Sequence, residues 1–362
     1  MKKNPLVTIC FLTYNYAQKL EKALKPLINQ SYQNIQIIIS DNQSTDNTEE
    51  VARKIASRYQ KVVYRKNIPD IKIDEFNDIS NKDTTGRKKT YDVVFNHCNS
   101  CLKSGIIQGE LVIFCHQDDI YHEDIVKDQV DFLTINEHVP AVFTLGNIIN
   151  EHDKIIGKYK LPKELRHKNI YYFEEIFKGI LNHGNTFLIA PTFMARIELF
   201  EHVGLFNDQG PFGGSDDLEM WLRILERYPI GIIHKKLINW RVGGRGKKYN
   251  NLRTSKADFF KVMDYYLEEK KYSKKNDIKS LRQYHYQKDF DDTLRSMNFL
   301  INGDVDQAKK IINSSFSRQI FLAFFENVKI IRVKVMALKI ILFLGVNLGF
   351  GKYLGKILQR IV

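Results

Sequence analysis

The sequence predicts an α/β protein with a largely parallel sheet, and two observations support this. Apolar, strand-like runs alternate with amphipathic helical segments over roughly the first 65 residues, and such alternation produces right-handed parallel connections. The 362 residues are 43% hydrophobic and 27% charged, which is untypical of disordered, collagen-like or coiled-coil chains. The length corresponds to about two domains.

The first two strands are expected on either side of a short helix. Leu6–Leu12 is a β-rich apolar run that ends in a polar turn. Leucines then recur at helical spacing over Leu20–Ile28, although Pro26 interrupts the pattern. Ile35–Ile39 is a continuous β-branched run, which is typical of a strand buried on both faces.

A second helix and a third strand complete this repeat. Asp46 and Glu49 resemble a capping box at the start of the helix. The apolar residues expected on one face of that helix are Val51, Ile55 and Tyr59. Val62–Tyr64 is the third strand.

The middle of the chain continues the α/β pattern after a polar, irregular loop at residues 67–90. The expected elements are a helix at Tyr91–Ser104, a strand at Leu111–Cys115, a helix carrying Val126, Val130 and Leu133, a strand at Ala141–Leu145, a helix carrying Leu218, Trp221, Leu222 and Leu225, and two short strands within 230–242. A glycine-rich basic loop, Gly243–Lys248, follows.

Beyond about residue 255 the chain is expected to be helical, with the bend of a helical hairpin at Asn302-Gly303-Asp304. Residues 318–362 hold eight Lys or Arg and one acid, and their longest uncharged run is too short to span a bilayer. Lys329, Arg332 and Lys339 share one helical face among apolar residues, which is the composition of a helix lying in a membrane interface. The alternative is a terminal helix packed on the protein with a solvated basic edge.

The net charge of +13 makes an acidic partner a consideration: nucleic acid, a membrane surface or a phosphorylated small molecule. No basic stripe interleaved with aromatic residues appears at the strand ends, so nucleic acid is not expected. Cys98 and Cys101 form a lone C-x-x-C without two further zinc ligands at suitable spacing. The start of the chain lacks the pattern of a signal peptide, so an intracellular protein is expected.

Three polar clusters follow predicted strands, at Thr13-Tyr14-Asn15, Asp41-Asn42 and Asp118-Asp119. Ligands of open parallel sheets bind at the carboxyl ends of the strands. Crowded carboxylates repel, and Mg²⁺ or Mn²⁺ with substrate phosphates would relieve that repulsion. The alternative for Asp118 and Asp119 is that they cap the following helix. No P-loop or G-x-G-x-x-G pattern is present.

Four segments in sequence order resemble family 2 glycosyltransferases of the GT-A fold, over roughly residues 5–245. They are Val7–Tyr16, Ile37–Thr48, Gly109–Asp119, and Val203–Asn207 with Asp216–Arg223. The resemblance implies a GT-A-like, nucleotide-binding mixed sheet flanked by helices, followed by the C-terminal helical region.

The resemblance also implies roles for residues in these segments. The uridine of the donor would be held by Thr13, Tyr14, Asn15 and Asp41. Asp118 and Asp119 would reach the ribose and a Mn²⁺ or Mg²⁺ ion on the diphosphate. Asp217 matches the general base that deprotonates the acceptor hydroxyl, and Asp216 replaces the usual Glu beside it. The alternative for this aspartate pair is N-capping of the helix that carries Trp221.

Two departures from the family pattern affect the metal and the diphosphate. His116 replaces the first acid of the Asp-x-Asp segment, which weakens the expected metal site. The downstream Tyr-Arg-x-His reads Trp240-Arg241-Val242-Gly243 here and lacks its His. The cations expected to cover the diphosphate instead are Arg241, Arg245 and Lys247.

The resemblance therefore implies an inverting glycosyltransferase of the bacterial cell-surface polysaccharide type. It would move a sugar from a nucleotide diphosphate donor, with UDP expected, to a lipid-linked or polysaccharide acceptor at the cytoplasmic face of the membrane. The expected parts are 1–250 (donor half 1–120, acceptor half 121–250), a helical extension 251–317, and basic apolar helices 318–362 at an anionic membrane surface. The alternative function is a catalytically silent GT-A module that binds glycan or a partner protein.

Overall fold

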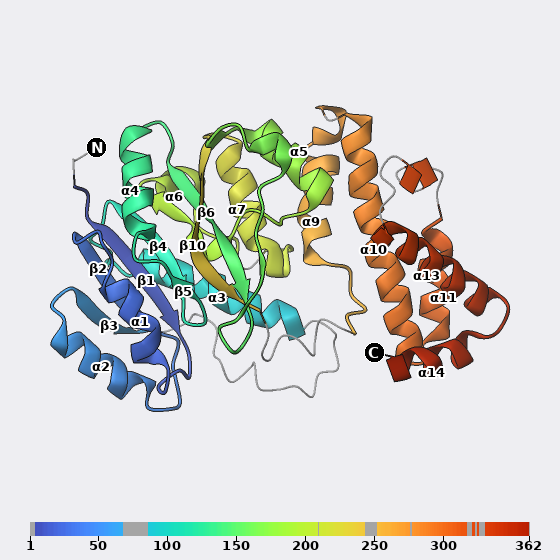
Figure 1. Cartoon of the computed structure of the whole chain (residues 1–362), viewed down its shortest axis with the longest axis horizontal. Helices are drawn as coiled ribbons and strands as arrows, with labels where there is room; N and C mark the ends of the chain where they lie inside the picture. The colour runs from blue at the N-terminus through green and yellow to red at the C-terminus, as the bar shows by residue number, and fades with distance from the viewer. Residues whose placement is uncertain are drawn as a thin grey trace. The chain divides into compact units, whose positions relative to one another are not determined.

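The computed structural model describes residues 4–67, 86–208, 210–242, 252–275, 277–316, 321–322, 324–325 and 330–361 (Figure 1). These residues form two compact units. Unit 1 contains the residues up to Val242 except 178–184, and unit 2 contains 178–184 and the residues from 252 onward.

Unit 1 is built on one sheet that has ten strands among the described residues, in the order β3-β2-β1-β4-β9-β6-β10-β5, with β7 on β6 and β8 on β10. The strands are β1 (Val7–Thr13), β2 (Ile35–Asp41), β3 (Val62–Lys66), β4 (Leu111–His116), β5 (Ile120–Tyr121), β6 (Ala141–Ile149), β7 (Ile155–Lys158), β8 (Ile170–Tyr171), β9 (Met194–Arg196) and β10 (Ile230–Arg241).

The sheet is mixed, as predicted. β1 runs parallel to β2 and to β4, β2 to β3, and β6 to β10. β9 is antiparallel to both of its neighbours, β4 and β6. The register pairs Thr13 with Asp41 and Leu12 with His116, so β1, β2 and β4 reach their carboxyl ends at one edge of the sheet.

Helices cover both faces of this sheet (Figure 1). Those of unit 1 are α1 (Leu20–Ile28), α2 (Thr48–Arg58), α3 (Gly86–Lys103), α4 (Ile125–Ile135), α6 (Leu199–Val203) and α7 (Asp216–Leu225), while α5 (Phe173–His183) belongs partly to each unit. Alternate residues of β1, β2 and β4 pack with apolar residues of α1, α2 and α4 in one buried cluster, as the two-residue period of a strand requires. On α7, Trp221 packs against Phe143 of β6 and against Phe206, which in turn contacts Phe114 of β4.

Three local expectations differ from the structure. Tyr59 is 40% exposed, because it follows α2 in an extended conformation, and the helix buries Thr48, Ala52 and Ile55 instead. Residues 230–241 form one strand, β10, with two register shifts against β6, where two short strands were expected. α3 begins at Gly86, five residues before the expected start. The predicted loop residues 68–85 and the basic loop Gly243–Lys248 lie outside the described residues.

Unit 2 is helical. Its main helices are α9 (Asp258–Asp264), α10 (Ile278–Ile301), α11 (Val305–Ser314), α13 (Ile330–Asn347) and α14 (Gly351–Ile361). The expected hairpin bend is confirmed between α10 and α11: Gly303 has a φ of +85°, and the Asp304 carboxylate accepts the Gln307 N–H at 3.0 Å. No helix in the described part of the chain has both the length and the apolar character needed to cross a bilayer.

The predicted orientation of the basic stripe on α13 is wrong. Lys339 is fully buried, where its Nζ donates to the carboxylate of Asp289 and, at 2.6 Å, to the carbonyl oxygen of Ser315. The Arg332 guanidinium lies 4.2 Å from the ring centroid of Tyr286. These two cations therefore lie on the side of α13 that also buries Leu342, while other apolar residues of the helix face outward. Lys329 lies outside the described residues.

Candidate active site

The side chain of Gln117, directly after β4, forms hydrogen bonds with the residues at the end of β1. Its Oε1 accepts hydrogen bonds from Thr13 Oγ1 at 2.7 Å and from the Tyr14 N–H at 2.8 Å. Its Nε2 donates to the carbonyl oxygen of Tyr14 at 3.2 Å. No role was predicted for this glutamine, although its position directly after a strand in the Asp-x-Asp-like segment was a usable signal.

Asn15 holds the turn that follows β2. Its φ of 48° is left-handed, a conformation that asparagine tolerates better than most residues. Its N–H donates to Ser44 Oγ at 2.8 Å, and its side-chain Oδ1 accepts the Thr45 N–H at 2.8 Å. The polar clusters after β1 and β2 are thereby joined into one surface, as expected from the shared edge.

Asp41 is fully buried at the end of β2. Its Oδ1 accepts the Ser44 N–H at 3.1 Å and also the Ser44 hydroxyl, and its Oδ2 accepts the Tyr64 hydroxyl at 3.1 Å. Burial, together with the Asp41 charge, raises the pKa of Tyr64 and keeps that phenol a donor. A carboxylate accepts about four hydrogen bonds, so Asp41 keeps capacity for one more donor.

Asp118 and Asp119 have different environments although they are adjacent. Asp118 is exposed, and its charge adds to burial in raising the pKa of Tyr16 to about 12. Asp119 is 4% exposed, and its Oδ1 accepts the backbone N–H of Arg241 at 2.9 Å. Burial raises the pKa of Asp119 to about 7. Asp118 is therefore the carboxylate of this pair that is accessible from solvent.

Arg241 joins two loops to the end of β10. Its Nε donates to the Asp118 carbonyl at 2.8 Å, one Nη to the Asn150 carbonyl at 2.6 Å, and the other Nη to Asp153 at 2.5 Å. With Lys22, it holds the pKa of Asp153 below its usual value. Two of its five N–H groups are left for a ligand. Arg245 and Lys247, the other cations predicted for the diphosphate, lie outside the described residues.

The residues predicted to hold a metal provide suitable donors. Asp118 and Asp119 supply the hard oxygens that Mg²⁺ and Mn²⁺ prefer. His116 is half-buried, and burial lowers its pKa to about 4, so its imidazole is neutral and capable of coordination. The described residues contain no ready group of three or more His, Cys, Asp or Glu around a metal position. A phosphate-bound ion needs only one or two protein carboxylates.

The acidic pair Asp216 and Asp217 lies in the first turn of α7, after the N-cap Ser215. Asp216 is fully buried, and Asp217 is half-buried with its Oδ1 accepting the Leu218 N–H at 2.7 Å. Burial raises the pKa of Asp217 to about 6. Neither aspartate occupies the N-cap position, although Asp217 does bond an amide of the first turn. A carboxylate with this pKa is suited to accept a proton near neutral pH.

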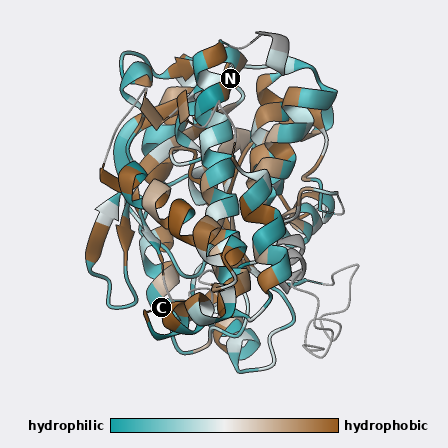
Figure 2. Ribbon diagram, turned by 90° about the vertical axis from the view of Figure 1, so that its right-hand side faces the viewer, coloured by the Kyte–Doolittle hydropathy of each residue, from teal (hydrophilic) through white to brown (hydrophobic). Residues whose placement is uncertain are grey.

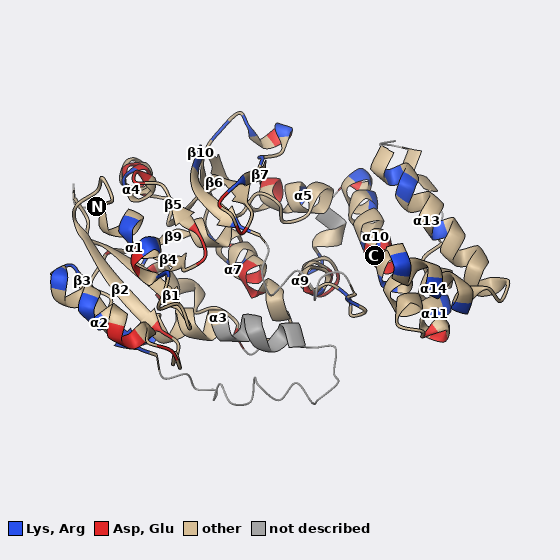
Figure 3. Cartoon of the chain, turned by 60° about the horizontal axis from the view of Figure 1, so that its bottom comes forward, with Lys and Arg blue, Asp and Glu red and all other residues tan. Residues whose placement is uncertain are grey.

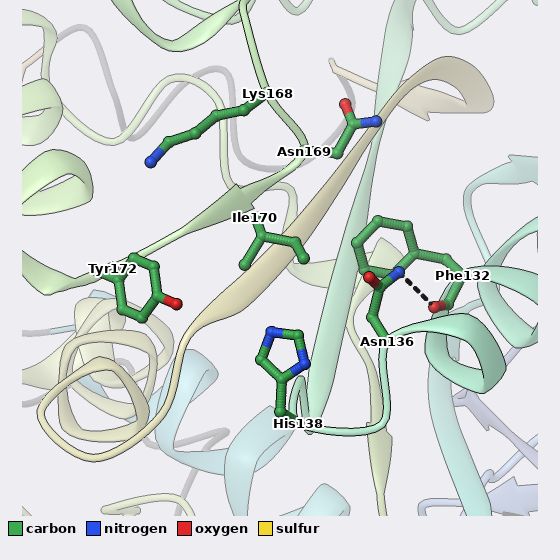
Figure 4. Close-up of a pocket in the computed structure, with 7 residues that line it drawn as sticks. All are labelled: Phe132, Asn136, His138, Lys168, Asn169, Ile170 and Tyr172. Carbon is green, nitrogen blue, oxygen red and sulfur yellow. Dashed lines mark hydrogen bonds between the residues drawn. The ribbon is translucent and has the colours of Figure 1, made fainter.

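A pocket lies at the opposite end of β10 from this edge. Its lining residues are Phe132, Asn136, His138, Lys168, Asn169, Ile170 and Tyr172 (Figure 4). Ile170 pairs with Gly231 at the start of β10, whereas Arg241 ends that strand beside Asp119. None of the predicted site residues lines this pocket.

Comparisons with known proteins agree with the resemblance seen in the sequence. Residues 8–68 match the family model described as glycosyl transferase family 2. An uncharacterized glycosyltransferase of Haemophilus influenzae is 26% identical over 301 residues, 80% of this chain and 83% of that protein. An Escherichia coli protein named UDP-Glc:alpha-D-GlcNAc-diphosphoundecaprenol beta-1,3-glucosyltransferase WfaP is 24% identical over 61% of this chain and 71% of its own length.

Other relatives are matched over less of their length. The alignment with an uncharacterized glycosyltransferase of Rickettsia typhi, at 26% identity, covers 67% of this chain and 66% of that protein. That with a Rickettsia felis protein covers 34% of the relative. Among solved structures, a mannosyltransferase from Pyrobaculum calidifontis in complex with GDP-Man and Mn²⁺ aligns with 99% of this chain and 87% of that one, with a TM-score of 0.48 and 14% identity.

Proposed function

Because residues 8–68 match the family model of glycosyl transferase family 2, we propose that this chain is a member of that family and transfers a sugar from a nucleotide diphosphate donor to an acceptor hydroxyl with inversion. Asp217 carries the proposal, because a half-buried carboxylate with a pKa of about 6 suits a general base. It would take the proton of the acceptor hydroxyl while that oxygen attacks the anomeric carbon. Asp216 lies fully buried beside it.

The donor nucleotide would lie at the carboxyl ends of β1, β2 and β4. Asp41 would accept the uracil N3–H with its remaining capacity, and Tyr14 would stack on the base. Thr13 and Asn15 would act mainly by shaping this surface, since their side chains bond Gln117 and Thr45. UDP is the expected nucleotide, in keeping with the donor named for the E. coli relative.

Asp118 and Asp119 would hold Mn²⁺ or Mg²⁺ on the diphosphate, and Asp118 would also reach the ribose. When bound, the ion stabilises the charge that develops on the leaving nucleoside diphosphate. Arg241 would position the Asp118 carboxylate and offer its two remaining N–H groups to the diphosphate. Arg245 and Lys247 remain proposed partners of the same group.

The acceptor is proposed to be a lipid-linked or polysaccharide glycan in cell-envelope synthesis. The E. coli relative is named for a diphosphoundecaprenol-linked acceptor, which supports the lipid-linked class. Residues 1–120 would then form the donor half and 121–250 the acceptor half, followed by the extension 251–317. Residues 318–362 would act at the cytoplasmic face of the membrane.

The test combines nucleotide binding with turnover. Calorimetry with UDP, once with Mn²⁺ and once with EDTA, should show binding that Asp41→Asn weakens and Asp217→Asn leaves unchanged. Release of UDP from UDP-sugars in the presence of diphosphoundecaprenol-linked glycans should be lost in Asp217→Asn. UDP binding without turnover on any acceptor of this class would favour the silent module, and no binding of UDP would exclude the proposed donor.

A further inference from the structure

Helix α13 exposes an apolar face. Large apolar side chains recur along it at helical spacing and remain open to solvent, with Ile330 78% and Leu348, just beyond its end, 65% exposed. The other members of this face are Val333, Ile340, Ile341 and Leu344. The opposite face is buried through Val335, Leu342 and Val346 (Figure 2 shows hydrophobic residues in brown). A helix with an inner and an outer apolar face has more apolar surface than unit 2 itself covers.

Helix α14 repeats the pattern in a narrower form. Its small residues Gly351 and Gly355 are buried, and a Cβ at Gly355 would come within 2.3 Å of the Leu300 carbonyl oxygen, so this side lies flat on α10. Two exposed stripes run along the outer side, each with a spacing of four residues. The apolar stripe is Tyr353, Ile357 and Ile361, and the basic stripe is Lys352, Lys356 and Arg360.

The charged side chains of α13 and α14 indicate what kind of partner binds this surface. Residues 330–361 contain no acidic residue, and the charged side chains of α13 and α14 are all basic (Figure 3). Arg332 and Lys339 bond within unit 2, which leaves Lys334 and the basic stripe of α14 exposed. A symmetric pairing of two copies through this surface would oppose like charges, whereas an anionic lipid headgroup layer would attract them.

We propose that the exposed apolar face of α13 and the two outer stripes of α14 form one bilayer-binding surface. In this arrangement the apolar side chains enter the boundary between headgroups and acyl chains, and the exposed cations contact anionic headgroups. The proposal rests on the proposed function only in that a lipid-linked acceptor places the reaction at a membrane. Binding to lipid requires no transfer reaction, so each proposal can fail without the other.

The test is vesicle flotation of the full-length chain. Vesicles of phosphatidylcholine alone are compared with vesicles in which a third of the lipid is phosphatidylglycerol. The wild-type protein should float with the anionic vesicles, and the bound fraction should fall as salt is added. The combined variant Ile341→Gln, Leu344→Gln, Leu348→Gln should reduce binding about tenfold or more.

Two further variants separate the sources of binding. Lys352→Gln, Lys356→Gln, Arg360→Gln should lose the preference for anionic vesicles. The matched control, Ile135→Gln with Ile278→Gln, removes apolar side chains that are equally exposed elsewhere and should bind like wild type. Circular dichroism confirms that each variant is folded.

Failure of the wild-type protein to float with either vesicle overturns the proposal. So does binding that the control variant loses as fully as the α13 variant. A wild-type dimer that the α13 variant converts to a monomer, without flotation of either, assigns the surface to self-association and also overturns it.

Discussion

The candidate active site in unit 1 and helix α13 in unit 2 treat buried charge in opposite ways. Asp119 and Asp217 accept hydrogen bonds from backbone N–H groups, and burial raises their pKa values to about 7 and 6. Burial also raises the pKa of Asp289 to about 6, but this carboxyl accepts from the Lys339 ammonium and so faces a countercharge. A buried charge without a countercharge destabilises the fold, whereas a paired charge becomes destabilising only when one partner is removed. The first arrangement suits the proposed proton transfer, whereas the second joins two helices of unit 2.

The largest expected effect is at Asp217. Asp217→Asn should lower kcat by about 10²- to 10⁴-fold, because the amide cannot accept the acceptor proton. The midpoint of thermal unfolding should not fall, because the substitution removes a partly desolvated charge. Glu123→Gln, an exposed acid far along the chain, is the matched control. A variant that loses both activity and thermal stability would show that Asp217 has a structural role, like the buried charges of unit 2.

Lys339 should show the opposite behaviour. Lys339→Met leaves Asp289 without its countercharge and should cost unit 2 about 3–5 kcal/mol. Hydrogen exchange of peptides from α10 and α13 measures this loss in the full chain. Lys334→Met, an exposed cation on the same helix, should change protection little. Equal protection in both variants would show that the buried pair is dispensable.

The pH profile sharpens the comparison. A general base must be ionised, so kcat/KM should fall about tenfold per pH unit below the Asp217 pKa of about 6 and level off above it. The sign follows from the raised pKa: protonation at low pH fills the lone pair that the acceptor proton needs. Profiles measured on UDP release at saturating metal provide the check. A plateau that extends down to pH 4 would remove Asp217 from this role.

Gln117 is expected to give the smallest effect. Gln117→Leu removes the acceptor of the Thr13 hydroxyl and the Tyr14 N–H, and should weaken UDP binding about tenfold. Gln117→Glu keeps an oxygen acceptor and should retain most of the affinity. Calorimetry on the two variants tests the assignment, and equal affinities would show that this connection does not shape the nucleotide surface.

Many of the residues at the sheet edge that carries the candidate site could be predicted from the sequence. Polar residues directly after buried strands are visible in a single chain, and the parallel register of β1, β2 and β4 brings them together. The position of Gln117 was visible but its bonding partners were not, because they depend on β4 lying beside β1, with two other strands between them in chain order. The shifts in β10 were missed for a similar reason, since its register is set by pairing with β6.

The orientation of α13 shows another limit of sequence reasoning. Helical spacing correctly grouped Arg332 with Lys339, but it does not reveal which side of a helix meets the rest of the protein. The countercharge of Lys339 lies 50 residues earlier in the chain, on α10. The cations of this apolar helix were therefore expected on its outer side, whereas the structure buries Lys339 and directs Arg332 toward Tyr286.

The hydrogen bonds of Arg241 have a consequence for how this protein tolerates change. Surface turns usually accept insertions, because no other part of the molecule depends on their length. The turn between β6 and β7 differs, since Asn150 and Asp153 both receive donors from Arg241. An added residue there would detach Arg241 and release the loop that carries Asp118. In chains that have this arginine, we therefore expect insertions that change the acceptor to occur in turns that the arginine does not contact.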